Sequence, residues 1–131
     1  QQRAGGLCWR YWFDYVAEAE HATYTNGAWH GNEVPYVFDT LGQVEPSRQY
    51  VNERDLAFAA QVADYWVSFA RDAGARDSLV GPTRWPACRK GRDVLLRIGV
   101  NKHAGFRLEN RFMRARMSLF KRVMKHHVSL D

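Results

Sequence analysis

Residues 7–16 are an apolar stretch that restricts the possible folds of this chain more than any other part of the sequence. In a strand, successive side chains point to opposite faces, and here both faces are mostly apolar. One face carries Leu7, Trp9, Tyr11, Phe13 and Tyr15, and the other carries Cys8, Trp12 and Val16. Such a strand is typical of the middle of a sheet that helices cover on both sides. The stretch therefore predicts an α/β fold.

Two later segments have the periodicity of amphipathic helices. Asn52 and Asp55 form a capping-box-like pair that predicts the start of a long helix, and Gly74 predicts its end. Its expected buried stripe is Ala59, Val62, Trp66 and Phe69. A last helix is expected over residues 106–127, with apolar residues from Leu108 to Met124 as its inner stripe. Residues 93–98 are expected to form a short strand, and residues 40–51 and 74–91 irregular connections.

Residues 26–38 place one histidine, His30, between two glycines. The glycines allow a tight turn. Asn32 is expected to cap a short helix, with Pro35 in its first turn. His30 would then lie on a fixed loop just ahead of a buried helix, which is typical of a functional imidazole.

The histidine loop reads Ala28-Trp29-His30-Gly31-Asn32-Glu33 and continues as Pro35-Tyr36-Val37-Phe38. This pattern resembles the histidine loop of type B carboxylesterases, a family that includes para-nitrobenzyl esterases, bile-salt-type lipases and cholinesterases. Residues 64–71 and 85–88 are also similar to the family, although Cys88 stands where an aromatic residue is usual. The resemblance covers most of the chain but only the C-terminal portion of the family's fold. It implies that residues 1–131 are the C-terminal segment of a single α/β-hydrolase domain, incomplete on its own.

The resemblance implies hydrolysis of a carboxylic ester by a serine, a histidine and a carboxylate. In α/β hydrolases these follow one another in the order serine, acid, histidine, and His30 fits the third role. Glu33 would support the loop through hydrogen bonds, or would act only as a favourable charge at a helix start. Trp29 is a candidate for lining the acyl pocket, with simple packing as the alternative.

The other two members of such a triad are not found in this sequence. No serine has the Gly-x-Ser-x-Gly setting of a nucleophile elbow; the serines are Ser47, Ser68, Ser78, Ser118 and Ser129. The acidic residues Asp14, Glu18 and Glu20 lie too close before His30 for the family's spacing. We therefore expect the serine and the acid in an upstream part of the same polypeptide. We also expect these 131 residues alone to be inactive.

Other functions are considered beside this one. The same family includes non-catalytic adhesion proteins that keep the fold and lose catalytic residues. The net charge of +5 is concentrated in the last third of the chain, as in some nucleic-acid-binding modules. A solvated basic helix face, partly neutralised by the acidic first part, explains this charge better, so we expect no nucleic-acid partner. No metal-binding motif accompanies His30 and Glu33, and we expect neither a metal nor a cofactor.

The two cysteines, Cys8 and Cys88, fit either one disulfide or two buried thiols. No apolar run approaches the roughly 18 residues of a membrane span, so no transmembrane segment is expected. Localisation stays open, because a signal peptide upstream of Gln1 would direct the protein to a secreted or periplasmic location. The expected partner is a small or lipid-like ester substrate.

Overall fold

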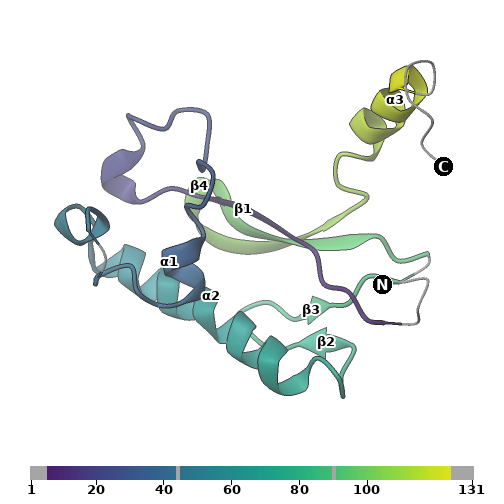
Figure 1. Cartoon of the computed structure of the whole chain (residues 1–131), viewed down its shortest axis with the longest axis horizontal. Helices are drawn as coiled ribbons and strands as arrows, with labels where there is room; N and C mark the ends of the chain where they lie inside the picture. The colour runs from purple at the N-terminus through teal and green to yellow at the C-terminus, as the bar shows by residue number, and fades with distance from the viewer. Residues whose placement is uncertain (1–5, 44, 90, 125–131) are drawn as a thin grey trace.

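The computed structural model describes residues 6–43, 45–89 and 91–124 (Figure 1). Strand β1 (Tyr11–Tyr15) comes first, followed by the 3-10 helix η2 (Glu18–Glu20), helix α1 (Val34–Val37) and the 3-10 helix η3 (Ser47–Gln49). The long helix α2 (Glu53–Asp72) precedes two short strands, β2 (Ser78–Leu79) and β3 (Trp85–Pro86). Strand β4 (Val94–Asn110) and helix α3 (Arg114–Met124) follow.

Strand β1 runs parallel to the first part of β4, with Tyr11 opposite Leu96 and Phe13 opposite Ile98. Parallel neighbours need a crossover connection, and α1 and α2 lie between them in the chain. The fold is therefore α/β, as the apolar stretch predicts. Among the described strands β1 pairs with β4 alone, and it is shorter than residues 7–16.

Strand β4 reverses direction part-way along. Asn101 and Lys102 both have positive φ angles, of 53° and 70°, as the central residues of a two-residue hairpin turn do. The backbone amide of Arg111 donates to the carbonyl of Asp93 at 2.9 Å, and Figure 1 shows the strand returning beside itself. The segment is thus a hairpin, which extends the strand expected over residues 93–98.

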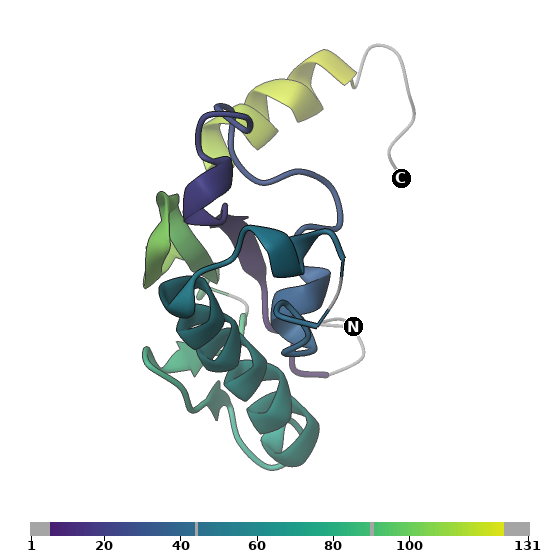
Figure 2. The ribbon, with the colours of Figure 1, turned by 90° about the vertical axis from the view of Figure 1, so that its left-hand side faces the viewer.

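The expected helix over residues 106–127 is wrong in its first part, since residues 106–110 belong to β4 and α3 begins only at Arg114. Phe106 and Leu108 alternate with the charged Arg107 and Glu109, which is the period of a strand. In Figures 1 and 2, α3 projects away from the other elements, and none of its residues is buried. Of the stripe expected to face inward, Met117, Phe120 and Val123 are each at least half exposed. Residues 125–127 lie outside the described residues.

Helix α2 begins as the sequence predicts. The side-chain oxygen of Asn52 accepts hydrogen bonds from the amides of Arg54 and Asp55, and the carboxylate of Asp55 accepts one of 2.8 Å from the amide of Asn52. This is a complete capping box, which satisfies amides that have no partner within the helix. The helix ends at Asp72, two residues before Gly74.

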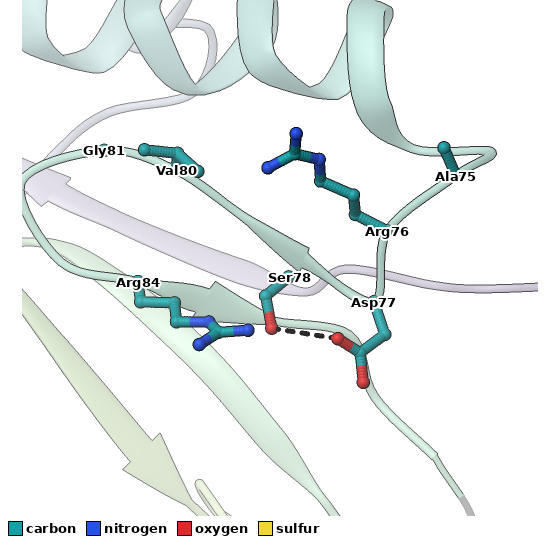
Figure 3. A pocket seen from close by; sticks show the side chains of 7 residues that line it. All are labelled: Ala75, Arg76, Asp77, Ser78, Val80, Gly81 and Arg84. Atoms are coloured by element: carbon teal, nitrogen blue, oxygen red, sulfur yellow. Dashed lines mark hydrogen bonds between the residues drawn. The ribbon is translucent and has the colours of Figure 1, made fainter.

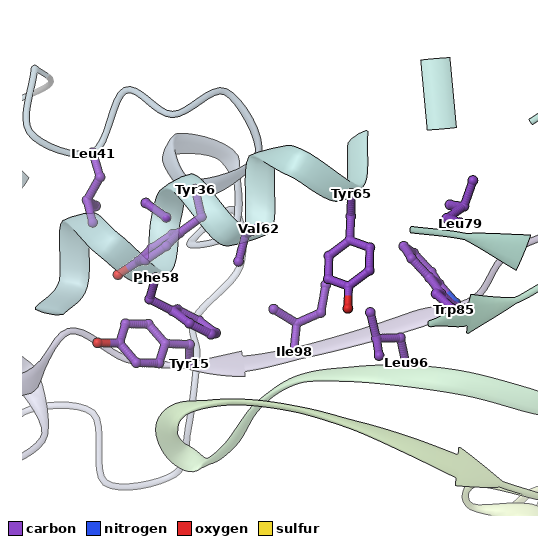
Figure 4. Close-up of a cluster of buried hydrophobic side chains, with 11 residues drawn as sticks. Tyr15, Tyr36, Leu41, Phe58, Val62, Tyr65, Leu79, Trp85, Leu96 and Ile98 are labelled. Carbon is purple, nitrogen blue, oxygen red and sulfur yellow. The ribbon is translucent and has the colours of Figure 1, made fainter. Parts of the chain in front are cut away.

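The core lies between α1 and α2 on one side and β1 and β4 on the other (Figures 2 and 4). In Figure 4, Val62 and Tyr65 of α2 point toward Ile98 and Leu96 of β4. Burying a side chain of this size contributes about 1.5–3 kcal/mol. Of the expected stripe, Trp66 packs against this cluster, whereas Phe69 is 46% exposed. The apolar spacing thus predicted the correct buried face of α2, but the predicted buried stripe extends too far toward the C-terminus of the helix.

Among the described residues, no helix has the length and apolar character that crossing a membrane requires.

Candidate active site: the histidine loop

His30 lies in a tight turn that precedes α1. The amide of Asn32 donates to the carbonyl of Trp29 at 3.2 Å, and Gly31 has a φ angle of 81°. A β-turn with a positive φ at its third residue is a type II turn, which favours glycine there. His30 and Gly31 are the two central residues of this turn, so the sequence around the histidine dictates how it is presented.

Gly27, on the other side of His30, permits a close contact. Its φ angle is 107°, and a Cβ there would lie 3.0 Å from Oδ1 of Asp14. Asp14 forms an ion pair with Arg97 of β4, and both side chains are mostly buried. The loop backbone therefore packs directly against a charged pair between β1 and β4.

Asn32 does not cap α1, contrary to the expectation. The N-cap residue is Glu33, and no side chain makes a capping hydrogen bond there, although Pro35 does lie in the first turn. Asn32 is instead 4% exposed, and its Nδ2 donates to the carbonyl of Tyr15 at 2.9 Å. Its side chain turns back toward β1 because a buried amide needs a partner, and this bond ties the end of the loop to the end of the strand.

The tip of the β4 hairpin holds the other end of the loop. The amide of Val16 donates to the carbonyl of Lys102 at 3.3 Å, and Nζ of Lys102 donates to the carbonyl of His21 at 3.1 Å. The positive φ of Lys102 turns the chain at this point. Residues 16–33 are thus anchored at both ends by β1 and β4.

Asp55, at the start of α2, adds a buried anchor. Its carboxylate accepts hydrogen bonds from the hydroxyl of Tyr15 and from the amides of Glu18 and Asn52. These donors compensate a carboxylate that is fully buried. Burial raises the pKa of Tyr15 well above its ordinary value, and the bond to Asp55 raises it further, so the hydroxyl remains a donor.

The imidazole of His30 is exposed and takes part in none of the hydrogen bonds or ion pairs between described residues. His21 differs, because its Nε2 lies 2.9 Å from the carbonyl oxygen of Val16 and its ring packs edge-on against His103 at 5.1 Å. His126 and His127 lie outside the described residues. Both ring nitrogens of His30 are therefore open to groups beyond this part of the chain.

Three of the described serines make hydrogen bonds to residues other than His30. Ser47 Oγ donates to the carbonyl of Leu41 at 2.7 Å, Ser68 Oγ accepts from the amide of Val80 at 3.1 Å, and Ser78 Oγ donates to Asp77 at 3.3 Å. Ser118 lies on α3, which projects from the rest of the chain (Figure 1). No described serine is hydrogen-bonded to His30.

Comparison with known proteins supplies the context for this loop. The sequence profile described as "Carboxylesterase family" matches residues 1–119. The chain belongs to the carboxylesterase family. No curated protein sequence matches it.

Among solved structures, 59 chains match this carboxylesterase-family chain. One is the crystal structure of a carboxylesterase from Geobacillus stearothermophilus, with a TM-score of 0.66 and 24% sequence identity. The match covers 90% of this chain and 22% of that one, so the present chain spans about a fifth of the enzyme's length. The α/β fold described above thus corresponds to part of a carboxylesterase fold.

Within this carboxylesterase-family loop, Glu33 and Trp29 are placed differently from His30. Glu33 is half-buried, and its charge lies close enough to Tyr11 to raise the pKa of that hydroxyl, after the larger effect of burial. Trp29 is 45% exposed and borders a hollow of about 380 Å³ together with Tyr24 and Tyr50. His30 does not line this hollow. The role of Glu33 as a loop support and that of Trp29 as a pocket wall stay predictions.

A second hollow, of about 640 Å³, lies elsewhere in this carboxylesterase-family chain, between the end of α2 and the β2–β3 pair (Figure 3). Its side chains include Arg76, Arg84 and Ser78, and none comes from the histidine loop. Within residues 6–43, 45–89 and 91–124, no three His, Cys, Asp or Glu side chains gather as a metal ion would require. The assignment of the histidine loop as the active site stays a prediction.

Proposed function

We propose that this chain supplies the triad histidine of a serine carboxylesterase, with the serine and the acid on an upstream part of the same polypeptide. The observation that carries the proposal is His30, exposed on a glycine turn that is anchored at both ends, with neither ring nitrogen hydrogen-bonded to a described residue. A triad histidine needs both nitrogens, one for the serine and one for the acid. Membership of the carboxylesterase family supports ester hydrolysis as the reaction.

His30 would act as a general base and then as a general acid. In the first half-reaction one ring nitrogen takes the proton of the serine hydroxyl as the oxygen attacks the ester carbonyl, and it returns that proton to the departing alcohol. In the second, the same nitrogen takes a proton from water as the water attacks the acyl-serine, and it gives that proton to the departing serine oxygen as the carboxylic acid is released. The upstream carboxylate would hold the other nitrogen and stabilise the imidazolium. Imidazole suits this task because its ordinary pKa is about 6.5.

The fixed loop would contribute by positioning. A proton is transferred well only when donor and acceptor lie within hydrogen-bond distance, and a displacement of about 1 Å is costly. The Gly31 turn and the bond from Asn32 to Tyr15 restrict where the His30 backbone can lie. Glu33 would add support at the start of α1, and Trp29 would form part of the acyl pocket.

The test uses the complete polypeptide that contains this chain. We expect it to hydrolyse short-chain nitrophenyl esters, and one equivalent of an organophosphonate to abolish the turnover by covalent attachment to a serine. A non-catalytic adhesion protein of the same fold would neither turn over the esters nor bind the phosphonate covalently, and that outcome would reject the proposal. The 131 residues alone are expected to show no turnover; phosphonate-sensitive turnover by them would show that the nucleophile lies in this chain.

A further inference from the structure

Cys8 and Cys88, distant in the sequence, face each other in the structure. They are the two partners of an isolated antiparallel bridge, and the amide of Cys88 donates to the carbonyl of Cys8 at 2.7 Å. Next to this bridge, Nε1 of Trp9 donates to the carbonyl of Trp85 at 3.2 Å. These contacts join the segment ahead of β1 to β3 and to the segment that follows β3.

The spacing of such a bridge suits a disulfide. Directly opposite residues in an antiparallel pair have Cα atoms about 4.5–5.5 Å apart, within the range of about 4.4–6.8 Å that disulfides span. Their side chains also leave the same face of the backbone ladder. Rotation about the Cα–Cβ bonds is therefore the main change needed to bring the two sulfur atoms together.

Both residues are free thiols in this structure. The Sγ of Cys88 donates to the carbonyl of Val94 at 2.8 Å, and Cys88 is 3% exposed. Cys8 is only partly buried, so an external reagent meets Cys8 first. The pair thus combines one accessible thiol with one buried thiol directly opposite.

We propose that Cys8 and Cys88 form a reversible disulfide that fastens the segment ahead of β1 to the rest of the fold under oxidising conditions. The oxidant is a small-molecule disulfide. The thiolate of Cys8 attacks one of its sulfur atoms, forms a mixed disulfide and releases one thiolate. The thiolate of Cys88 then attacks the sulfur of Cys8 and releases the second. Two protons leave the cysteines, two electrons pass to the reagent, and the reagent becomes two thiols.

The consequence is a redox-dependent covalent link between the segment ahead of β1 and the rest of the fold. A bond between residues so distant in sequence restricts the unfolded chain over most of its length, which favours the folded state. Strand β1 ends at Tyr15, whose carbonyl holds the histidine loop through Asn32. In the linked protein, unfolding by denaturant should require a higher denaturant concentration than in the reduced protein.

The test is peptide mapping of the complete polypeptide after equilibration with glutathione and glutathione disulfide. Remaining free thiols are alkylated, and the protein is digested with trypsin without reduction. We expect residues 4–10 and 85–89 to appear as one disulfide-linked pair in the oxidising buffer and as two separate peptides after dithiothreitol. Alkylated or glutathione-bearing peptides alone, at every ratio of glutathione to its disulfide, would overturn the proposal.

A matched variant separates this bond from other redox effects. The urea midpoint of the native protein should shift upward on oxidation, and the shift should be lost in Cys8→Ser. An equal shift in Cys8→Ser would mean that another group is responsible and would contradict the proposed disulfide. Because the mapping uses the native sequence, its result does not depend on how well the variant folds.

Discussion

The side-chain amide of Asn32 donates a hydrogen bond of 2.9 Å to the backbone carbonyl of Tyr15. Asn32 directly follows the turn that presents His30, and Tyr15 is the last residue of β1. The bond therefore closes the loop between strand and helix at its base. Because Asn32 is buried, water cannot readily replace this bond, and the position of His30 depends on it.

Asn32→Ala should loosen the histidine loop. An unpaired buried carbonyl costs about 1–3 kcal/mol of stability, and a displaced imidazole should lower kcat by about 10- to 100-fold with little change in KM. Steady-state kinetics and urea unfolding of the complete polypeptide measure both effects. Asn26→Ala, at an exposed position of the same loop, is the control and should alter neither. A fully active Asn32→Ala protein would show that this bond does not position His30.

Gly31→Ala tests the turn itself. Alanine at a φ angle of 81° is strained by about 1–2 kcal/mol, so the turn should relax by moving His30. We expect a fall in kcat and a lower melting temperature. Gly74→Ala is the matched control, since nothing lies within 4 Å of its added Cβ and its φ angle is ordinary. Equal effects of the two substitutions would argue against a strained histidine turn.

Gly99→Ala should be much more damaging than Gly91→Ala. Both glycines have positive φ angles, of 83° and 85°. At Gly99 a Cβ would lie 2.4 Å from the backbone nitrogen of Tyr15, whereas nothing lies within 4 Å of a Cβ at Gly91. The difference isolates the close approach of β4 to β1 at the start of the histidine loop. Soluble yield and circular dichroism of both variants measure it, and equal behaviour would contradict the close approach.

Tyr15→Phe should destabilise the protein at neutral pH by about 1.5–3 kcal/mol, because the buried Asp55 carboxylate loses a donor. Tyr36→Phe is the control, since Tyr36 is equally buried but its hydroxyl makes no hydrogen bond between described residues. Urea unfolding at pH 7 compares the two variants. Equal losses would show that the bond to Asp55 contributes little.

The same tyrosine predicts a pH dependence. Burial and the bond to Asp55 raise the pKa of Tyr15 in the folded protein, while in the unfolded chain it is about 10. The folded state therefore keeps this proton when the unfolded state has lost it, so stability is complete below about pH 10 and falls as the pH rises further. The decline should be shallower in Tyr15→Phe. An unchanged alkaline slope would show that Tyr15 ionises equally in both states.

Local signals in the sequence were the most reliable guide to this fold. The capping pair Asn52 and Asp55 acts over three residues, and it forms as predicted. The glycines beside His30 correctly predicted the turn, because a turn also depends on a few neighbouring residues only. The partner of Asn32 was not predictable, because a capping role would use its side-chain oxygen as an acceptor. The observed bond uses its Nδ2 as a donor, and only the tertiary fold brings the Tyr15 carbonyl close.

The hairpin of β4 was missed because two patterns compete in that segment. Apolar residues from Leu108 onward fit a helical stripe, while the alternation of Phe106 to Glu109 is too short to stand out. Asn101 and Lys102 carry the deciding signal, but they form a turn pair less distinctive than Asn-Gly. Cys8 and Cys88 lie opposite each other because the tertiary fold pairs two segments that are distant in the sequence. Their spacing in the sequence does not indicate this pairing.

The most direct test of the central claim compares His30→Ala with His21→Ala in the complete polypeptide. His21 lies in the same loop, but its Nε2 already contacts a backbone carbonyl. We expect His30→Ala to fold normally and to lose kcat by about 10⁴-fold or more, while His21→Ala retains kcat within a few-fold. Near-normal turnover by a folded His30→Ala protein would contradict the assignment of His30 as the catalytic base.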